Sequence, residues 1–135
     1  MATTEHLLDV VERLTRRWDE RDTEGTLAYY TDDVDYQEVG AGRSLQGKDA
    51  LREYLANYFA AFDSRWVITS HDRLEGKDAI IANWNMEVWR PGSDQRIMTR
   101  GMDILTVRGD QVCSDIVHFD RMQLQPLMQQ RTTAA

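Results

Sequence analysis

The sequence is poor in the residues that mark several classes of protein. It holds one cysteine, Cys113, and two prolines among 135 residues. A single cysteine permits no disulfide within the chain, which is typical of proteins from a reducing compartment. No cysteines and histidines have the spacing of a zinc site, and no loop has the carboxylate spacing of a calcium site. We therefore expect neither a bound metal nor another cofactor.

Clusters of positive charge and long apolar runs are missing as well. The 16 lysines and arginines are spread along the chain, and 23 aspartates and glutamates leave a formal net charge of −7. Nucleic acids and anionic membrane surfaces attract basic patches, so neither is an expected partner. No apolar run approaches the length of a membrane span, and residues 1–6 do not begin a signal peptide. The default expectation is a cytoplasmic protein.

Hydrophobic periodicity predicts helices first and strands afterwards. Apolar residues recur at helical spacing over residues 5–21 and 48–62, and Asp22 can cap a short helix between them. One short strand is expected at residues 34–39. Four further stretches alternate like antiparallel strands: residues 65–74, 79–89, 96–108 and 111–120. This order predicts an α+β fold, and we expect one domain over residues 1–125 with a frayed tail over 126–135.

Carboxylates stand on strand faces that are otherwise apolar. Alternation places Glu38 beside Tyr36 and Asp103 beside Leu105. A carboxylate that faces a core is costly unless it is paired, hydrogen-bonded or protonated, so two of them predict a small-molecule pocket. The structural alternatives are a solvated strand end for Glu38 and a buried hydrogen bond to a neighbour for Asp103. Asp115 has a mixed strand face, and solvent exposure is the alternative to a role in the pocket.

Several segments resemble the nuclear transport factor 2-like superfamily. The similarity is carried by residues 30–38 (YTDDVDYQE) and 47–54 (GKDALREY), and it continues through residues 101–105 (GMDIL) and 110–120. The resemblance implies a cone-shaped α+β barrel, with three N-terminal helices packed on a curved, mostly antiparallel sheet. The superfamily includes ketosteroid isomerases, SnoaL-like polyketide cyclases, epoxide hydrolases, dehydratases and proteins without catalytic activity.

The resemblance to ketosteroid isomerase implies roles for the carboxylates. Glu38 falls where the proton-shuttling carboxylate of that family sits, and Asp103 falls where a protonated aspartic acid donates to the oxyanion. Near the place of the family's oxyanion tyrosine this chain has Leu14, which cannot donate a hydrogen bond. In SnoaL-like cyclases an aspartate stands where this chain has Val117, and Asp115, two residues earlier, could replace it.

The pocket wall is expected to be apolar and aromatic and to hold a hydrophobic small molecule. Its expected members are Trp18, Tyr30, Tyr36, Leu55, Phe59, Trp84, Met86, Val117 and Phe119. The plain alternative is that these residues form ordinary core. On the opposite sheet face, Asn83, Asn85, Glu87 and Trp89 form a polar and aromatic surface. Together with the resemblance, that surface favours a homodimer through the outer sheet face.

Two hypotheses about function follow. In the first, a small enzyme without a cofactor acts on a hydrophobic cyclic carbonyl or enol compound. Glu38 moves a proton next to the carbonyl and protonated Asp103 stabilises the enolate. Isomerisation, cyclisation and dehydration share that first step. In the second, the same pocket binds a hydrophobic ligand without converting it, or the chain serves as a dimerisation module, and the absence of the oxyanion tyrosine favours this second hypothesis.

Overall fold

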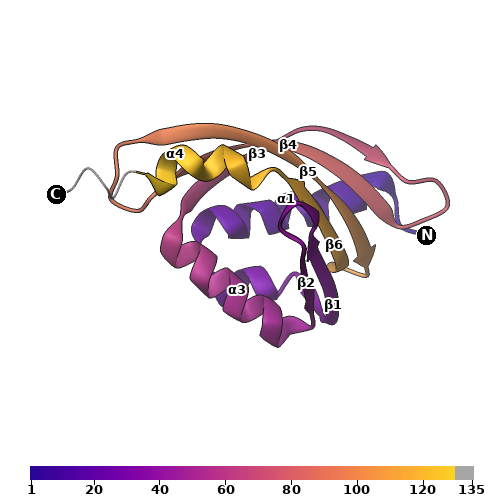
Figure 1. Ribbon diagram of the computed structural model, residues 1–135. Coiled ribbons are helices and arrows are strands. Elements are labelled where there is room, and N and C mark those ends of the chain that lie inside the picture. Colours follow the sequence, from indigo (N-terminus) through magenta and orange to yellow (C-terminus); the bar gives the residue numbers. More distant parts are fainter. Residues whose placement is uncertain (130–135) are drawn as a thin grey trace.

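One curved sheet forms the frame of the protein. The computed structural model describes residues 1–129, and Figure 1 shows the sheet arching over the helices. Its six strands are β1 (Tyr30–Glu38), β2 (Arg43–Gln46), β3 (Asp63–Arg73), β4 (Ala79–Trp89), β5 (Arg96–Arg108) and β6 (Gln111–Phe119). The strand order is β2-β1-β6-β5-β4-β3. Only the β1–β6 pair is parallel, so β3 to β6 form the predicted antiparallel meander.

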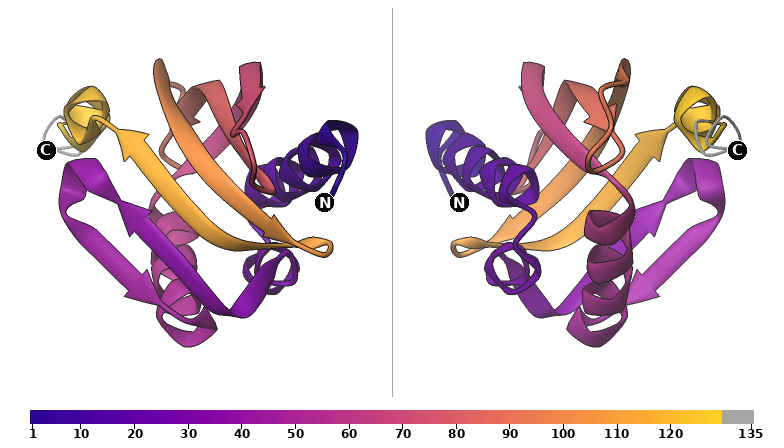
Figure 2. Two further views of the ribbon diagram at one scale, coloured as in Figure 1. Left: turned by 90° about the vertical axis from the view of Figure 1, so that its right-hand side faces the viewer. Right: turned by 90° about the vertical axis from the view of Figure 1, so that its left-hand side faces the viewer.

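Two long helices cover the concave face of the sheet. Helix α1 (Thr4–Glu20) begins at Thr3, whose hydroxyl oxygen accepts a hydrogen bond from the backbone N–H of His6. It packs against β3, while α3 (Lys48–Ala61) packs against β1 and β2, and the short α2 (Thr23–Leu27) lies between them. Figure 2 shows that the edge strands β2 and β3 remain apart, so the sheet does not close into a complete barrel.

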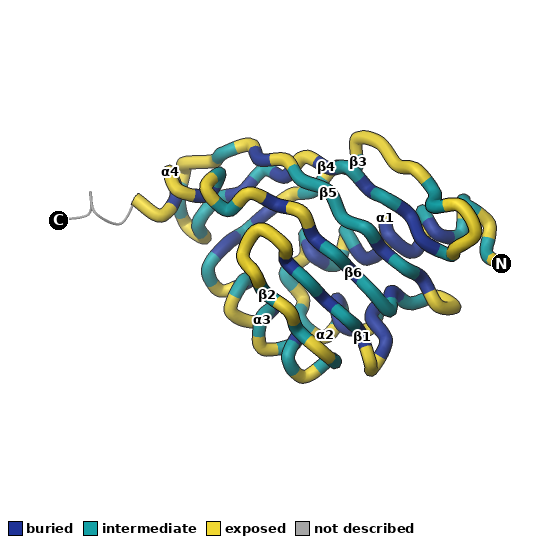
Figure 3. Tube along the Cα trace, turned by 45° about the vertical axis from the view of Figure 1, so that its right-hand side comes forward, coloured by how far each residue is buried: buried dark blue, intermediate teal, exposed yellow. Residues whose placement is uncertain are grey.

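The core lies between the sheet and these helices. Every second residue of β4 is buried, from Ile80 through Trp84 to Val88, as the alternating pattern predicts. Figure 3 shows the same alternation along the neighbouring strands. The α+β class, the curved and mostly antiparallel sheet and the three N-terminal helices are confirmed.

Several short elements were not predicted from the sequence. They are β2, the 3-10 helices η1 (Val39–Ala41) and η2 (Arg121–Leu124), and the helix α4 (Gln125–Met128). Helix α4 includes residues 126–128 of the expected tail, and Leu127 is fully buried because it packs against the core cluster. The remainder of that tail, residues 130–135, lies outside the described residues. Over the described part of the chain, no helix is long and apolar enough to cross a membrane.

Candidate functional site

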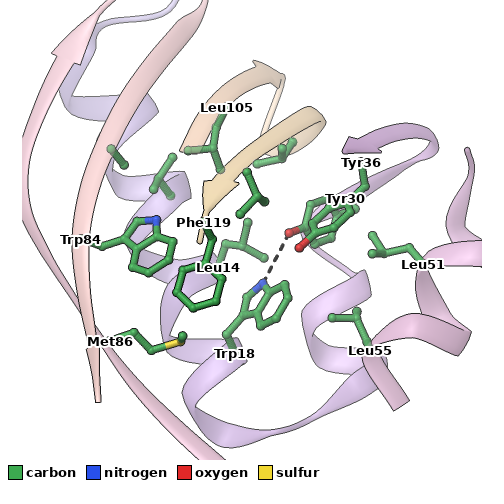
Figure 4. Packing of buried hydrophobic residues seen from close by; sticks show 14 of the residues in the cluster. Leu14, Trp18, Tyr30, Tyr36, Leu51, Leu55, Trp84, Met86, Leu105 and Phe119 are labelled. Atoms are coloured by element: carbon green, nitrogen blue, oxygen red, sulfur yellow. Dashed lines mark hydrogen bonds between the residues drawn. The ribbon is translucent and has the colours of Figure 1, made fainter. Parts of the chain in front are cut away.

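A small cavity lies between the concave face of the sheet and helices α1 and α3. Its volume is about 60 Å³, which is room for a few water molecules or a small part of a ligand. Six of the nine expected pocket residues line it: Trp18, Tyr36, Trp84, Met86, Val117 and Phe119. Figure 4 shows Trp84, Met86 and Phe119 gathered opposite Trp18. Aromatic and aliphatic side chains together therefore make up most of the wall.

The other three expected wall residues lie in the core behind the cavity. Leu55 is fully buried on α3, and Phe59, one turn further along, packs edge-on against Trp18. Tyr30 is also fully buried, and its hydroxyl points toward Asp115 rather than into the cavity. Of the carboxylates, Glu38 and Asp103 line the cavity, and Asp115 lies behind Asp103.

Asp115, which is buried, and Asp103, which is partly buried at the cavity wall, form a carboxyl pair. Asp103 lies on β5 and Asp115 on β6, and the two side chains share a hydrogen bond. The register pairs Asp115 with Leu105, two residues from Asp103, so the two carboxyls meet diagonally on one sheet face. Two carboxylates cannot approach in this way when both are ionised, so the contact requires a proton between them.

Neighbouring side chains hold the pair in place. The indole N–H of Trp84 donates to Oδ1 of Asp103 at 2.9 Å, and the hydroxyl of Tyr30 donates to Oδ2 of Asp115 at 2.8 Å. The indole N–H of Trp18 lies 3.4 Å from the Tyr30 hydroxyl, and Figure 4 marks this contact. The other oxygen of Asp115, Oδ1, is buried and receives no hydrogen bond from a fixed donor, so it is available to carry the proton of the pair. Each carboxyl is thus anchored by one neutral donor.

Burial dominates the electrostatics of the pair. It raises the pKa of Asp103, and it raises the pKa of Asp115 well above the usual aspartate range, with the nearby charge of Asp103 adding to the effect. The hydrogen bond between them raises the pKa of Asp115 and lowers that of Asp103, so the shared proton belongs to Asp115 and Asp103 accepts it. The solvent-exposed alternative for Asp115 does not hold, because its exposed fraction is 2%.

Glu38 is buried as well, but in a different environment. Its side chain is 3% exposed, so the alternative of a solvated strand end does not hold. Arg43 and the Tyr54 hydroxyl each donate to Oε1 at 3.0 Å, and Arg121 donates to Oε2 at 2.7 Å. Both oxygens of Glu38 are therefore engaged by donors, two of which are cationic.

Three residues of the site could not be assigned from the sequence. Arg43 and Arg121 belong to short elements without periodicity, and Tyr54 lies on α3 next to Leu55 without a pattern that marks it as a site residue. Burial and the adjacent charge of Glu38 raise the pKa of Tyr54 to about 12, so its phenol stays protonated and can donate. No sequence signal links these three residues, since the fold alone brings them to Glu38.

The described residues contain no group of three or more histidine, cysteine, aspartate or glutamate side chains arranged to hold a metal ion. The chemistry that the site can perform with its own residues is proton transfer. A carboxylate and a carboxylic acid lie side by side, and one of them faces an apolar cavity.

Comparison with known proteins identifies a family and a fold. The sequence model of the SnoaL-like domain family matches residues 11–114. No curated protein matches the sequence significantly. A protein with ketosteroid isomerase-like fold from Catenulispora acidiphila, solved with trimethylamine, has a TM-score of 0.76 and 15% identity, covering 87% of this chain and 90% of that one.

Two further solved structures are of proteins described as enzymes. A protein from Xanthomonas campestris pv. campestris, described as a polyketide cyclase, has a TM-score of 0.78 and 13% identity, covering 91% of this chain and 96% of that one. An epoxide hydrolase of the LEH-like kind from Mycobacterium tuberculosis has a TM-score of 0.76 and 14% identity, covering 96% of this chain and 90% of that one. At such identities the likeness shows the fold, and the fold hosts several chemistries.

Proposed function

The chain belongs to the SnoaL-like domain family, and on that premise we propose that it is a cofactor-independent enzyme that transfers a proton on a compact, hydrophobic cyclic carbonyl or enol compound. The observation that carries this proposal is the carboxyl pair of Asp103 and Asp115 at an apolar cavity. A pair with a single proton offers an acid and a base at the same place. Burial brings both groups closer to the pKa range in which proton transfer at neutral pH is efficient.

Asp103 is the base in this proposal. It faces the cavity, and its pKa is raised by burial, whereas Glu38 is already engaged by two arginines and a phenol. This assignment moves the role of base to Asp103 from Glu38, where the resemblance to ketosteroid isomerase had implied it. Asp115 holds its proton toward Asp103, so that the pair carries one negative charge before the proton is abstracted and none while the enolate exists.

The proposed reaction begins with transfer of a proton from carbon to Asp103. A carboxylate oxygen of Asp103 takes the proton on the carbon next to the carbonyl, and the C–H electron pair moves into the carbonyl to give an enolate. Arg121 lines the same cavity, and of its five N–H donors one is given to Glu38, so others can be offered to the enolate oxygen. Asp103 then returns the proton to a carbon or oxygen atom. Isomerisation, aldol-type cyclisation and dehydration differ only in what the enolate does next.

The aromatic wall defines the kind of molecule that enters. Trp66 and Trp84 pack edge-on with ring centroids 4.4 Å apart, and Trp84 lies 5.7 Å from Phe119. Such a wall favours a flat, apolar ring, and the volume of about 60 Å³ restricts that ring to a compact one. Two solved structures with the same fold were obtained with small molecules, trimethylamine in one and polyporic acid in the other, which supports a small-molecule partner.

Exchange of a substrate proton with solvent tests the proposal, because it requires only the shared first step. Cyclic ketones, cyclic enones and phenols are incubated in D₂O, and deuterium incorporation is followed by proton NMR. Asp103→Asn should lower the exchange rate by about 100-fold or more, as expected when a general base is lost. Asp94→Asn, the same change in the exposed β4–β5 loop, should leave the rate unchanged.

The alternative is a module that binds a hydrophobic ligand without converting it. Catalysed exchange that is equal in wild type and Asp103→Asn would contradict the assignment of the base. Saturable binding of the same compounds, with no catalysed exchange and no pH dependence of affinity between pH 4 and 9, would favour the binding module. We also propose, from the polar and aromatic outer sheet face, that the protein is a homodimer.

A further inference from the structure

A groove continues from the mouth of the cavity to the surface. It lies beside β2, α3 and η2, has a volume of about 410 Å³, and shares Tyr54, Tyr58 and Arg121 with the cavity wall. The cavity itself is several times smaller, at about 60 Å³. A ring in the cavity therefore has room for substituents only on the side that opens into this groove.

Two arginines on the groove wall share one buried carboxylate. Arg43 comes from β2 and Arg121 from η2, and each donates one hydrogen bond to Glu38, which is 3% exposed. The two guanidinium groups and the single carboxylate leave an excess of one positive charge. Burying a charged pair rarely adds stability by itself, so an arrangement of three charges drawn from three elements indicates another role.

Both guanidinium groups keep donors for a ligand. A guanidinium has five N–H donors, and Glu38 takes one from each arginine. Their side chains remain 34% and 38% exposed, and both line the groove. Arg43 also stacks over the ring of Tyr54, with the guanidinium carbon 4.7 Å from the ring centre, which restricts its orientation. Glu38 thus acts as a positioning residue that presents two planar donors to the groove.

We propose that this groove binds a carboxylate group carried by the substrate, so that the substrate is a compact cyclic carbonyl compound with an acidic substituent. Planar guanidinium groups match a carboxylate with two parallel hydrogen bonds. Glu53, an exposed acid of α3, also lines the groove and opposes an anion there, although solvent screens its charge. The inference rests on the proposed function, which places the ring of the substrate in the cavity. It concerns the binding of the substrate and not its conversion.

Matched acid and ester probes distinguish binding through the acidic group from binding through the ring. The probes are benzoate, phenylacetate and 3-phenylpropanoate with their methyl esters, titrated against the protein while tryptophan fluorescence is recorded. Three tryptophans, Trp18, Trp66 and Trp84, line the cavity and report on an arriving ring. At least one carboxylate should bind about tenfold more tightly than its ester, since a hydrogen bond to a charged group is typically of that strength.

Two substitutions that each remove one charge from the groove should change the affinity for carboxylates in opposite directions. Arg43→Gln should weaken carboxylate binding about tenfold and leave ester binding unchanged, and added salt should reproduce part of that loss. Arg43 lies at the surface, and Arg121 and Tyr54 still pair with Glu38 in this variant, so the fold is retained. Glu53→Gln, the control on the same groove, should tighten carboxylate binding.

The proposed carboxylate site and the proposed function can be contradicted independently of each other. Equal affinities of acids and esters, absence of saturable carboxylate binding at millimolar concentration, or an Arg43→Gln variant with unchanged preference would each overturn it. Selective carboxylate binding in a protein that catalyses no proton exchange would leave the groove as an anion site and remove only the enzymatic proposal.

Discussion

At the scale of single residues, burial decides which carboxylate can do chemistry. Glu38 and Asp115 are both 2% exposed, yet one is surrounded by cations and the other by a second carboxyl and a phenol. The sequence pattern correctly placed Glu38 and Asp103 on inward strand faces. It could not show their partners, because Arg121 and Tyr30 reach the site from segments remote in sequence and Arg43 lies on the short strand β2, which was not predicted.

The raised pKa values of the pair have a cost in stability that depends on pH. In the folded state Asp103 and Asp115 hold protons at pH values where the unfolded chain has released them, above the ordinary aspartate pKa of about 3.9. The folded state then binds more protons than the unfolded state, so the free energy of unfolding falls as pH rises through this range.

Asp115→Asn should remove much of this dependence. An asparagine cannot ionise, but its amide can still accept from Tyr30 and donate to Asp103. We expect the free energy of unfolding of the variant to fall less steeply than that of wild type between pH 4 and pH 7, because residue 115 then has no proton to release. Urea unfolding at several pH values measures the difference, with Asp94→Asn as control. Parallel curves for wild type and Asp115→Asn would show that the pair has no raised pKa.

At the scale of elements, β5 and β6 bring the site together. Their turn and the register shift between Thr106 and Val107 place Asp115 opposite Leu105 and therefore diagonal to Asp103. The long elements were predictable, because their apolar residues repeat with the helical or strand period. Strand β2 and helices η2 and α4 were not predictable, because four residues are too few to show a period. Two of these short elements supply the arginines of the groove.

Gly101 on β5 is required for the placement of Trp84. A Cβ atom at this position would lie 2.5 Å from Cη2 of Trp84 and 2.8 Å from the carbonyl oxygen of His118. Since the backbone cannot yield, Gly101→Ala should displace the indole and weaken its hydrogen bond to Asp103. We expect a loss of roughly 1–3 kcal/mol in the free energy of unfolding and a shifted tryptophan emission.

The neighbouring Arg100→Ala provides the control for that change. Arg100 is exposed and its side chain lies on the outward face of β5, so its truncation should alter neither stability nor emission appreciably. A Gly101→Ala protein with wild-type stability and emission would mean that the strand adapts and that Trp84 is not fixed by this contact.

At the scale of the whole molecule, the sheet separates two surfaces with different tasks. The concave face holds the cavity, and the convex face carries a shallow hollow of about 590 Å³ lined by Asn83, Asn85, Met102 and His118 among others. The fold class followed from the order of helices and strands, and the family resemblance fixed its shape. The substrate did not follow, because the wall residues of this fold also serve as ordinary core.

The homodimer proposed for the convex face can be tested directly. Met102 is half-buried in the middle of that face, so Met102→Glu would place a like charge from each subunit in the interface. We expect sedimentation of the wild-type protein as a dimer and of the variant as a monomer with the same far-UV circular dichroism. A wild-type protein that sediments as a monomer would contradict the proposed dimer.

The most direct test of the account is a titration of the carboxyl pair itself. Aspartate side chains are labelled with ¹³C at the carboxyl carbon, and the signals of Asp103 and Asp115 are assigned with Asp103→Asn and Asp115→Asn. The account predicts that one proton remains on the pair at neutral pH, so that one apparent pKa lies well above the aspartate range. If both carboxyls release their protons near pH 4, as ordinary aspartates do, the pair cannot supply the acid and base that the proposed function needs.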